Sequence, residues 1–368
     1  MILSSLSLAG FRNLWDQSID FSSGINVIRG ENAQGKTNLL EAIFMLSCGR
    51  GFRTRFDREL IRFGNDFSKL EGEIFSHGRQ QTIDIKMGRC VRKQISLNGV
   101  RKNSSELSEA FRVVLFCPDD LNMIKEGAKE RRRFIDMAIS QLKPSYAELM
   151  SEYTRLYEHK RRILCDWREK PSLLDALEEY SDFMCRCSAK IIRYRAAYIK
   201  KLSMEAGSIH SRFSGNGEEL SVNYNTVSTV TDPFAPAVEI YQRLKEHQKS
   251  HREAEIASCS VLTGIHKDDL EISINGITAR NYASQGQMRT AALSLKMAER
   301  EVSFQDTGEN PVLLLDDVLS ELDPRRQEFV LNRIGEGQTF ITCCEDSRIK
   351  ERTGGQVINV SEGKVSLG

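Results

Sequence analysis

The sequence predicts an α/β fold in which a helical lobe interrupts a domain built on β-sheets. Three observations indicate this. Residues 1–120 alternate apolar and polar side chains in short runs, as strands do. From about Leu121 to His251 the pattern becomes helical, with long charged stretches and few turn signals. Strand-like runs then return near Val261 and at 269–274, so the second part of the sheet domain is expected to follow the insertion.

The strands expected before the lobe are short and end at glycine, proline or hairpin signals. They are residues 4–8, 17–21, 24–30, 70–75, 81–87, 94–97 and 113–116. A helix is expected over 36–47, where apolar residues recur at helical spacing. We therefore expect residues 1–121 and 253–368 to form the two parts of one domain, and residues 122–252 to form the lobe.

The lobe is expected to contain one long amphipathic helix. Apolar residues step by three or four from Leu174 to Leu202, which is about eight turns. This length is too short for an extended coiled coil.

Composition excludes several classes of protein. Hydrophobic residues make up 40% and charged residues 28% of the 368 residues, which is typical of a globular protein. The longest aliphatic run is far too short to span a membrane, and the N-terminal residues lack the pattern of a secretory signal. The nine cysteines show no zinc-ligand spacing and are expected to be reduced cytosolic thiols. A net charge of +1 means that any nucleic acid must bind at local basic patches.

A phosphate-binding loop is the strongest local signal. It has the pattern G-x-x-x-x-G-K-[ST], made by Gly30, Glu31, Asn32, Ala33, Gln34, Gly35, Lys36 and Thr37. The glycines permit a tight turn and the close approach of phosphate, and the following helix N-terminus attracts the anion. Lys36 is expected to reach the β- and γ-phosphates, and Thr37 to bind Mg²⁺. The pattern indicates a nucleoside triphosphate with Mg²⁺, and is shared by kinases, GTPases and motor ATPases.

An apolar strand, 312–315, ends in two carboxylates. A buried strand would hold Asp316 rigidly where it can bind Mg²⁺ through water. Asp317 would then orient or deprotonate the attacking water. The alternative is a solvated acidic turn, which the upstream phosphate loop makes the weaker interpretation.

A second anion site is expected at the start of a later helix. The residues are Ser284, Gln285, Gly286 and Gln287, followed by apolar positions at helical spacing. A hydroxyl group, free amides and the helix dipole together favour an anion. Taken alone, these residues are more typical of an ordinary helix cap, and it is their position before the acidic strand that favours the anion site.

The order of these motifs resembles that in ABC-type ATPases related to chromosome-maintenance proteins. The phosphate loop, the S-x-G-Q signature, the strand with two aspartates, and a loop with Ser320 and Asp323 follow one another as in that superfamily. The resemblance implies an ABC-type P-loop ATPase head with mixed sheets and an inserted α-helical lobe without a long coiled coil. It also implies a homodimer that buries two ATP molecules, each held by the phosphate loop of one subunit and the signature of the other.

Further blocks resemble the RecF family of bacterial recombination mediators. They are Phe11-Arg12-Asn13, Phe116-Cys117-Pro118-Asp119-Asp120-Leu121, Arg131-Arg132-Arg133-Phe134-Ile135-Asp136 and Thr263-Gly264-Ile265-His266-Lys267-Asp268-Asp269. This resemblance adds Arg12 and Asn13 to the ATP site. It implies an ATP-dependent clamp that binds single- and double-stranded DNA at gaps and stalled forks, and that helps RecO and RecR to load RecA. It also implies a DNA-stimulated ATPase in the cytoplasm, without a membrane.

Departures from the patterns of these families suggest slow hydrolysis. Ile265 and Lys267 stand where the RecF block has Pro and Arg. Asp317 stands where transporter-type ATPases place the longer Glu. The strand 339–342 leads into Cys343 and Cys344, with no switch histidine.

Two basic segments are candidates for DNA contact. The first contains Arg50, Arg53, Arg55, Arg58 and Arg62, and its interleaved residues Phe52, Phe56 and Phe63 are expected to anchor the segment in the core. The second is a stripe of Arg186, Lys190, Arg193 and Lys200 on the long helix. For each segment a merely solvated face is the alternative. The arginines of 131–133 are a third candidate, although they could position the lobe instead.

Two other functions share these motifs. The ATPase subunit of a membrane transporter has the same ATP motifs, but neither the large helical lobe nor the basic stripes are expected there. A DNA-end or gap-binding module would hold ATP without useful turnover. Retention of Lys36, Thr37, Asp316 and Asp317 disfavours complete inactivity.

Overall fold

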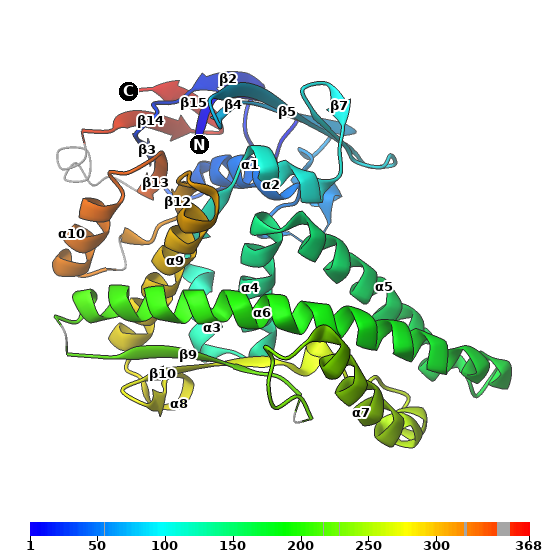
Figure 1. Cartoon of the computed structure of the whole chain (residues 1–368). Coiled ribbons are helices and arrows are strands. Elements are labelled where there is room, and N and C mark those ends of the chain that lie inside the picture. The colour runs from blue at the N-terminus through cyan, green and yellow to red at the C-terminus, as the bar shows by residue number, and fades with distance from the viewer. Residues whose placement is uncertain (55, 216, 228, 320–321, 344–353) are drawn as a thin grey trace. The chain divides into compact units, whose positions relative to one another are not determined.

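The computed structural model describes residues 1–54, 56–215, 217–227, 229–319, 322–343 and 354–368. The chain forms two compact units, one of residues Met1–Asp120 and Leu293–Gly368 and one of residues Leu121–Ala292 (Figure 1). The helix α9 (Gln285–Thr307) contributes residues to both units.

The described residues of the first unit form two six-stranded sheets. The strands of the antiparallel sheet are, in spatial order, β2 (Gln17–Asp20), β1 (Ile2–Ala9), β4 (Phe67–Ser76), β5 (Arg79–Gly88), β6 (Gln94–Leu97) and β7 (Val100–Arg101). The strands of the mixed sheet are β15 (Lys364–Leu367), β14 (Gln356–Ser361), β3 (Ile25–Arg29), β13 (Thr339–Cys343), β12 (Val312–Leu315) and β8 (Val113–Phe116). All neighbours in the mixed sheet are parallel except the β14–β15 hairpin.

The helix α1 (Lys36–Cys48) contacts strands of both sheets. Its residues from Leu39 to Ser47 are all buried, which is why the helix is apolar around most of its circumference rather than amphipathic. The unit also contains α10 (Pro324–Arg333), α2 (Leu107–Ala110), and the short 3₁₀ segments Asp57–Leu60, Ser104–Glu106 and Pro118–Leu121, the last of which ends one residue into the second unit.

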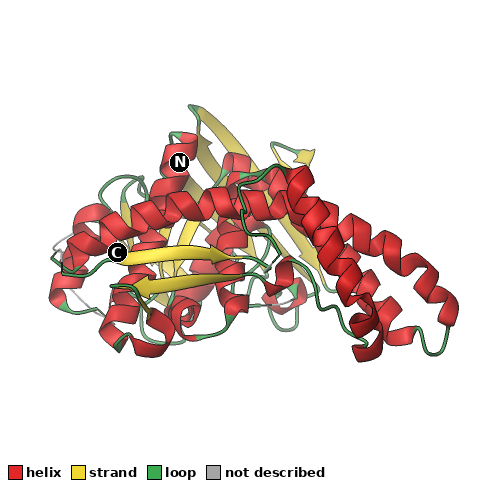
Figure 2. Cartoon of the chain, turned by 60° about the horizontal axis from the view of Figure 1, so that its bottom comes forward, coloured by secondary structure: helices red, strands yellow, loops and turns green. Residues whose placement is uncertain are grey.

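The second unit is mainly helical, with one three-stranded antiparallel sheet. Its helices are α3 (Asn122–Lys125), α4 (Ala128–Leu142), α5 (Pro144–Asp166), α6 (Leu177–Phe213), α7 (Ala237–Ser258) and α8 (Ala279–Tyr282). Its strands are β11 (Ile277–Thr278), β10 (Asp269–Ile274) and β9 (Leu220–Asn225). The helix α6 packs against α5, α7 and β9 (Figure 2).

A buried arginine of α6 forms ion pairs with carboxylates from two other segments of this unit. Arg195 on α6 is 1% exposed and forms ion pairs with Asp136 of α4 (2.9 Å) and with Asp268 (2.8 Å). Tyr146 donates to the Asp136 carboxylate (2.5 Å), and Tyr224 donates to that of Asp268 (2.5 Å). Because an isolated buried charge is very costly, loss of one partner would leave the others uncompensated.

The predicted class, an α/β fold with mixed sheets and an inserted helical lobe, is confirmed. The longest helix, α6, has 37 residues, and the described residues contain no long coiled coil. The α6 helix begins later and ends later than predicted, because apolar positions continue through Ala206 and Ile209. The strand predicted near Val261 is wrong, since residues 261–264 form a loop.

Sequence reasoning did not find β9, β14 and β15. Because β10 pairs with β9 along its whole length, residues after 252 join the second unit. In the structure the second unit ends at residue 292, whereas the sequence analysis expected the helical lobe to end at residue 252. No helix among the described residues is long and apolar enough to cross a membrane. The described cysteines are free thiols, and no cluster of three potential metal-binding His, Cys, Asp or Glu residues occurs in the described parts.

Candidate nucleotide-binding site

The phosphate loop, both aspartates and Thr342 gather at one edge of the mixed sheet. The register pairs Leu315 with Ile341, and Ile341 with Val27, across three adjacent parallel strands. Parallel strands end at the same edge, so the residues that follow them meet there. A loop between β3 and α1, and the acidic residues after β12, thus come together although the sequence separates them widely.

The loop backbone requires glycine at two positions. Gly35 has φ 118°, a conformation that side chains rarely adopt, and a Cβ atom there would lie 2.9 Å from Leu14 Cδ2. Gly30 has no such φ, but its Cβ would lie 2.2 Å from the carbonyl oxygen of Val360. Only glycine therefore fits at either position without displacement of neighbouring atoms.

Lys36 points its ammonium group back over the loop. The Nζ atom donates to the carbonyl oxygens of Gly30 (2.7 Å) and Glu31 (2.8 Å), and the side chain is largely buried. The positive charge is thus concentrated at the loop, where a compact ammonium can meet phosphate oxygens.

One carboxylate oxygen of Asp316 accepts hydrogen bonds from two hydroxyl groups. Thr37 Oγ1 lies 2.9 Å and Thr342 Oγ1 lies 3.0 Å from Asp316 Oδ1. Burial raises the pKa of Asp316, and the two hydrogen bonds oppose that shift. Thr37 and Asp316 supply the hard oxygen donors that Mg²⁺ prefers, so the donor set fits that ion.

Asp317 is exposed and has φ 53°. Its backbone N–H donates to Thr342 Oγ1 (2.8 Å). A non-glycine residue in this region is uncommon and typical of functional sites. Thr342 therefore fixes the turn that carries both aspartates, a role that the sequence reasoning did not assign.

Arg12 and Asn13 lie beside the loop. The Arg12 guanidinium forms a 2.8 Å ion pair with Glu41, which is fully buried in α1. Asn13 Nδ2 donates to the carbonyl of Gln34 (3.4 Å), and Asn38 donates to Asn13 Oδ1 (2.7 Å). Glu41 also accepts the backbone N–H of Arg53 (3.2 Å), so it links both Arg12 and the first basic segment to the phosphate-loop helix.

The C-terminal hairpin supports the loop from the other end of the chain. The backbone N–H groups of Glu362 and Gly363 donate to the side chain and backbone of Gln34 at 2.5 and 3.1 Å. The Trp15 indole donates to the Glu362 carbonyl (3.0 Å). No sequence motif marks this support, since it depends on β14 adding to β3.

The signature residues lie in the second unit, at the start of α9. Ser284 Oγ accepts the backbone N–H of Gln287 (3.2 Å), and Gln287 Oε1 accepts that of Ser284 (2.8 Å). This is a reciprocal capping box. The helix-cap interpretation is therefore confirmed, and the Ser284 O–H remains a possible donor at an exposed position. Gln285 is also exposed, and Gly286 is half-buried.

Of the two predicted loop residues after β12, Asp323 is described and Ser320 lies outside the described residues. Asp323 caps α10, and its carboxylate accepts the backbone N–H groups of Arg325 and Arg326 (3.1 Å each). The Arg326 N–H holds the pKa of this carboxyl below its usual value.

The first basic segment reaches towards the acidic site. Arg50 and Arg53 are exposed, while Arg55 lies outside the described residues. Arg53 is close enough for its charge to lower the pKa of Asp316, against the larger effect of burial. The expectation that its phenylalanines anchor the segment is wrong for Phe63, which is 99% exposed, and for Phe56, which is 46% exposed.

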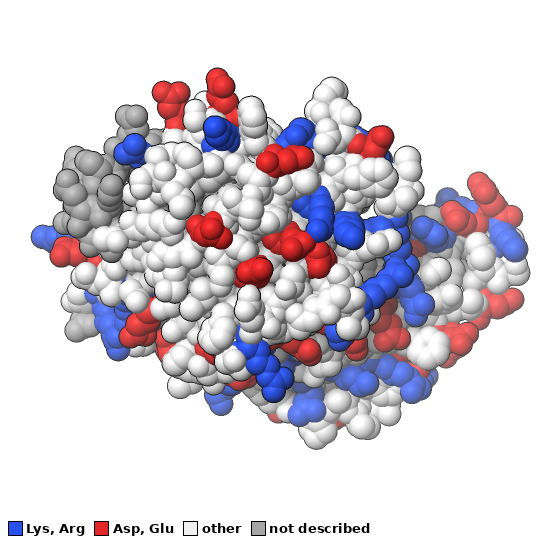
Figure 3. All heavy atoms as spheres, turned by 90° about the horizontal axis from the view of Figure 1, so that it is seen from above, with Lys and Arg blue, Asp and Glu red and all other residues white. Residues whose placement is uncertain are grey.

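The stripe on α6 is exposed but partly neutralised. Arg186 forms a 2.7 Å ion pair with Asp182, whereas Lys190 and Arg193 line a pocket that also contains Glu148 and Glu152. The face of the molecule drawn in Figure 3 likewise carries basic and acidic groups interspersed.

The third basic candidate has a packing role. Arg131 forms a bidentate pair with Asp269, and Arg132 donates to the carbonyl of Asp268 (2.5 Å). These arginines therefore fix α4 against the start of β10.

Comparisons with known proteins cover almost the whole chain. Residues 2–365 match the family model for the RecF/RecN/SMC N terminal domain. A "DNA replication and repair protein RecF" from Acetivibrio thermocellus is 38% identical, over 99% of each chain.

Two solved structures of the recombination mediator protein RecF in the RecFOR pathway are similar to this chain, one described as RecF-ATPrS and one as RecF-ATP. Their TM-scores are 0.93 and 0.92, and both are 33% identical. The alignments cover 99% and 100% of this chain, and 97% of each of those chains.

Proposed function

The chain belongs to the RecF family of ATPases, within the wider family of RecF, RecN and SMC N-terminal domains, and on that basis we propose that it is an ATP-driven clamp on DNA. The observation that carries the proposal is the convergence of Lys36, Thr37, Asp316 and Asp317 at one sheet edge. A phosphate loop placed next to two strand-end carboxylates has the groups that both bind and cleave a triphosphate.

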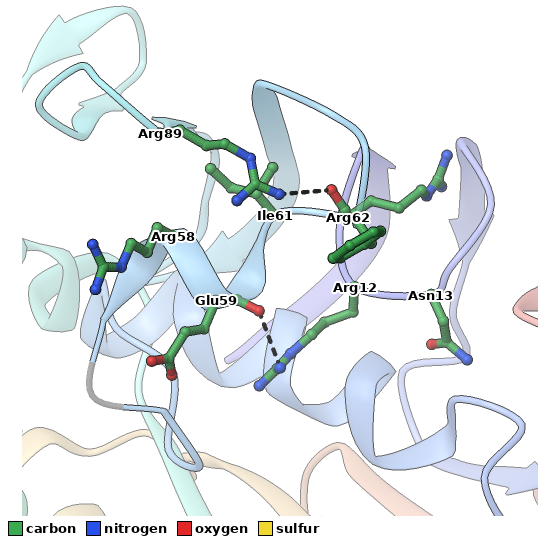
Figure 4. Close-up of a pocket in the computed structure, with 8 residues that line it drawn as sticks. Arg12, Asn13, Arg58, Glu59, Ile61, Arg62 and Arg89 are labelled. Carbon is green, nitrogen blue, oxygen red and sulfur yellow. Dashed lines mark hydrogen bonds between the residues drawn. The ribbon is translucent and has the colours of Figure 1, made fainter.

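Each residue of this edge has a distinct task in the proposed reaction. The loop amides of residues 30–35 and the Lys36 ammonium hold the phosphates of ATP. Thr37 and Asp316 hold Mg²⁺, which when bound neutralises charge on the phosphates. Arg12, paired with Glu41 of α1, and Asn13, which donates to the loop carbonyl of Gln34, complete the nucleotide site. Both line the pocket drawn in Figure 4.

Asp317 is proposed to orient and deprotonate the attacking water. Its carboxylate is exposed, and its backbone is held in place by Thr342. Asp is one methylene group shorter than Glu, so it reaches the water less well, which supports slow hydrolysis. Stimulation of this hydrolysis by DNA is proposed from family membership.

ATP is proposed to close a homodimer. Each chain has one phosphate loop and one signature, so two copies related by a twofold axis would enclose two nucleotides between the loop of one and Ser284–Gln287 of the other. The exposed Ser284, at a helix N-terminus, is suited to a phosphate oxygen. Asp323, which caps α10, is assigned to the same interface.

The proposed role is in DNA replication and recombinational repair, in the cytoplasm. The substrate is single- and double-stranded DNA at gaps and stalled forks, with Arg50, Arg53, Arg55, Arg186, Lys190 and Arg193 as candidate contacts. Family membership supports RecO and RecR as partners that help to load RecA.

Electrophoretic mobility of a gapped duplex tests the proposal. The purified chain is mixed with DNA without nucleotide, with ATP, and with a non-hydrolysable ATP analogue. A clamp should shift the DNA with the analogue, and less or not at all without nucleotide. The Lys36→Arg variant is the matched control: the longer planar guanidinium should misplace the charge, so ATP binding persists or weakens while hydrolysis is lost.

Other outcomes contradict the proposal. A shift that is the same with and without nucleotide would indicate a DNA-binding module that makes no use of ATP. Absence of any shift would favour the ATPase subunit of a transporter. Parental hydrolysis by Lys36→Arg would overturn the assignment of the phosphate loop.

A further inference from the structure

Glu218 lies in the second unit, in the segment between α6 and β9, and its two carboxylate oxygens have different partners. Oε1 accepts a hydrogen bond from the side-chain amide of Gln287 (2.8 Å), and Oε2 lies 3.1 Å from Nε2 of His210. Because a carboxylate can only accept hydrogen bonds, the His210 ring donates from Nε2. Glu218 therefore joins the last turn of α6 to the first turn of α9.

The His210 end of this bridge lies in the core of the second unit. The side chain of His210 is fully buried, whereas that of Glu218 is 25% exposed. A long helix with a buried ring is a rigid support, so the position of the Glu218 carboxylate is set by α6.

The backbone on either side of Glu218 is also fixed. The Glu218 N–H donates to Ser214 Oγ (3.1 Å) at the end of α6. The next residue, Glu219, donates its backbone N–H to Asn275 Oδ1 (2.8 Å) and accepts the Asn275 N–H on its carbonyl (2.8 Å). Since Asn275 begins the turn between β10 and β11, the Glu218 carboxylate has a defined place before any nucleotide binds.

Glu218 determines which way the Gln287 amide faces. Nε2 of Gln287 donates to Glu218, so Oε1 is the atom that accepts the backbone N–H of Ser284 (2.8 Å). The reversed amide would bring its oxygen against the carboxylate and its N–H groups against the Ser284 N–H, and both contacts would be repulsive. Glu218 thus selects the orientation that closes the capping box, and the exposed Ser284 stands on that box.

We propose that Glu218 is a positioning residue for the Ser284–Gln287 signature: by orienting Gln287, it holds Ser284 where a γ-phosphate bound to a second copy of this chain is received. This inference rests on the proposed function and deepens it, because it identifies a residue on which closure of the dimer depends. A site already held in its binding geometry needs no ordering when the phosphate arrives. The bridge would therefore strengthen dimerisation without changing how a single chain holds ATP.

The dimerisation constant of the full chain tests the proposal. Sedimentation with a saturating non-hydrolysable ATP analogue, over a series of protein concentrations, measures it. Glu218→Ala should weaken dimerisation about 10- to 100-fold, because each dimer has two signatures and each would lose a hydrogen bond to a charged group. Glu218→Gln keeps an oxygen that can accept the Gln287 amide, and should retain most of the dimerisation.

Two controls accompany these variants. Glu219→Ala removes the neighbouring exposed carboxylate but keeps the backbone hydrogen bonds to Asn275, and should dimerise as the parent does. The affinity of Glu218→Ala for a fluorescent ATP analogue, measured at a protein concentration too low for dimers, should also be parental.

A double-mutant cycle shows whether Glu218 acts through Gln287. In the Gln287→Ala background, addition of Glu218→Ala should weaken dimerisation by no more than about twofold further, because the link is already lost. A general loss of packing in the second unit would instead add its full effect to that of Gln287→Ala.

Four results would overturn the proposal. They are parental dimerisation of Glu218→Ala, an equal loss in Glu218→Gln and Glu218→Ala, additive losses in the double variant, and a lowered affinity of the Glu218→Ala monomer for the ATP analogue. Failure of the parental chain to dimerise with the analogue would refute the proposed function itself, and is distinguishable because no variant is involved.

Discussion

The Thr342 hydroxyl accepts the backbone N–H of Asp317 at 2.8 Å, although Thr342 lies within β13 and Asp317 follows β12, 25 positions away in the sequence. The same oxygen is 3.0 Å from Asp316 Oδ1, to which it donates. One hydroxyl group therefore holds the backbone of the proposed water-activating residue and the carboxylate of the proposed Mg²⁺ ligand.

Replacement of this threonine should separate catalysis from binding. Thr342→Val keeps the shape but removes the hydroxyl, which leaves the Asp317 N–H without its partner at a cost of about 1–3 kcal/mol. We expect ATP hydrolysis to fall about 10- to 100-fold, with ATP affinity changed much less. Thr342→Ser should retain most of the rate, because it retains the hydroxyl. A steady-state assay with parental turnover in Thr342→Val would contradict this role.

Asp317→Asn should slow hydrolysis and prolong the closed dimer. The amide keeps the size of the side chain but cannot accept a proton from water. Light scattering after addition of ATP should show dimers that persist longer than those of the parent. Dimers that dissociate faster would instead place Asp317 at Mg²⁺ or at the subunit interface.

Ser284→Arg should prevent dimerisation while each monomer still binds ATP. The long side chain would occupy the position that the γ-phosphate bound to the other subunit needs. Because Ser284 also caps α9, Ser284→Thr is the matched control: it keeps both hydroxyl and cap, and should dimerise. A Ser284→Arg protein that dimerises with ATP, measured by light scattering, is incompatible with the clamp.

The α6 stripe should contribute less to the salt dependence of DNA binding than its charges alone would give. Replacement of Arg186, Lys190 and Arg193 together with Ala should weaken DNA binding and reduce its salt dependence. Arg186 is already paired with Asp182, so Arg186→Ala alone should change the slope little. Binding isotherms at several salt concentrations measure both, and an unchanged slope in the triple variant would assign the stripe to solvent.

Because His266 is held in its neutral form, the stability of the second unit should fall at acid pH. Burial lowers the pKa of His266 to about 4. Its Nε2 atom faces the Val261 carbonyl (3.2 Å), so Nε2 carries the proton and Nδ1 accepts the Tyr153 hydroxyl (2.9 Å). The unfolded chain, with a histidine pKa near 6.5, binds the proton first as pH falls.

Stability should therefore be lost between about pH 6.5 and pH 4, by at most about 3 kcal/mol, with no further loss from this group below pH 4. Urea unfolding of the parent and of His266→Gln, compared over this range, measures the effect. Equal pH slopes in the two proteins would show that His266 does not contribute.

Much of the nucleotide site was predictable from sequence, because its signals are local. The phosphate loop has its residues within one turn and one helix start, and strand 312–315 ends directly at Asp316. The Ser284–Gln287 capping box likewise joins residues three apart. Backbone conformation and side-chain periodicity depend on near neighbours, so such features are visible in the chain itself.

Only the tertiary structure decided which groups that are distant in sequence join these local features at the nucleotide site. Thr342 and Glu362 reach the site because β13 and β14 flank β3, and strand order is set by packing rather than by any adjacent residues. Phe63 shows the converse, since its sequence neighbours predicted a buried anchor and the fold exposes it. Burial and long-range hydrogen bonds depend on which surfaces the whole chain brings together, and that information is not contained in a local pattern.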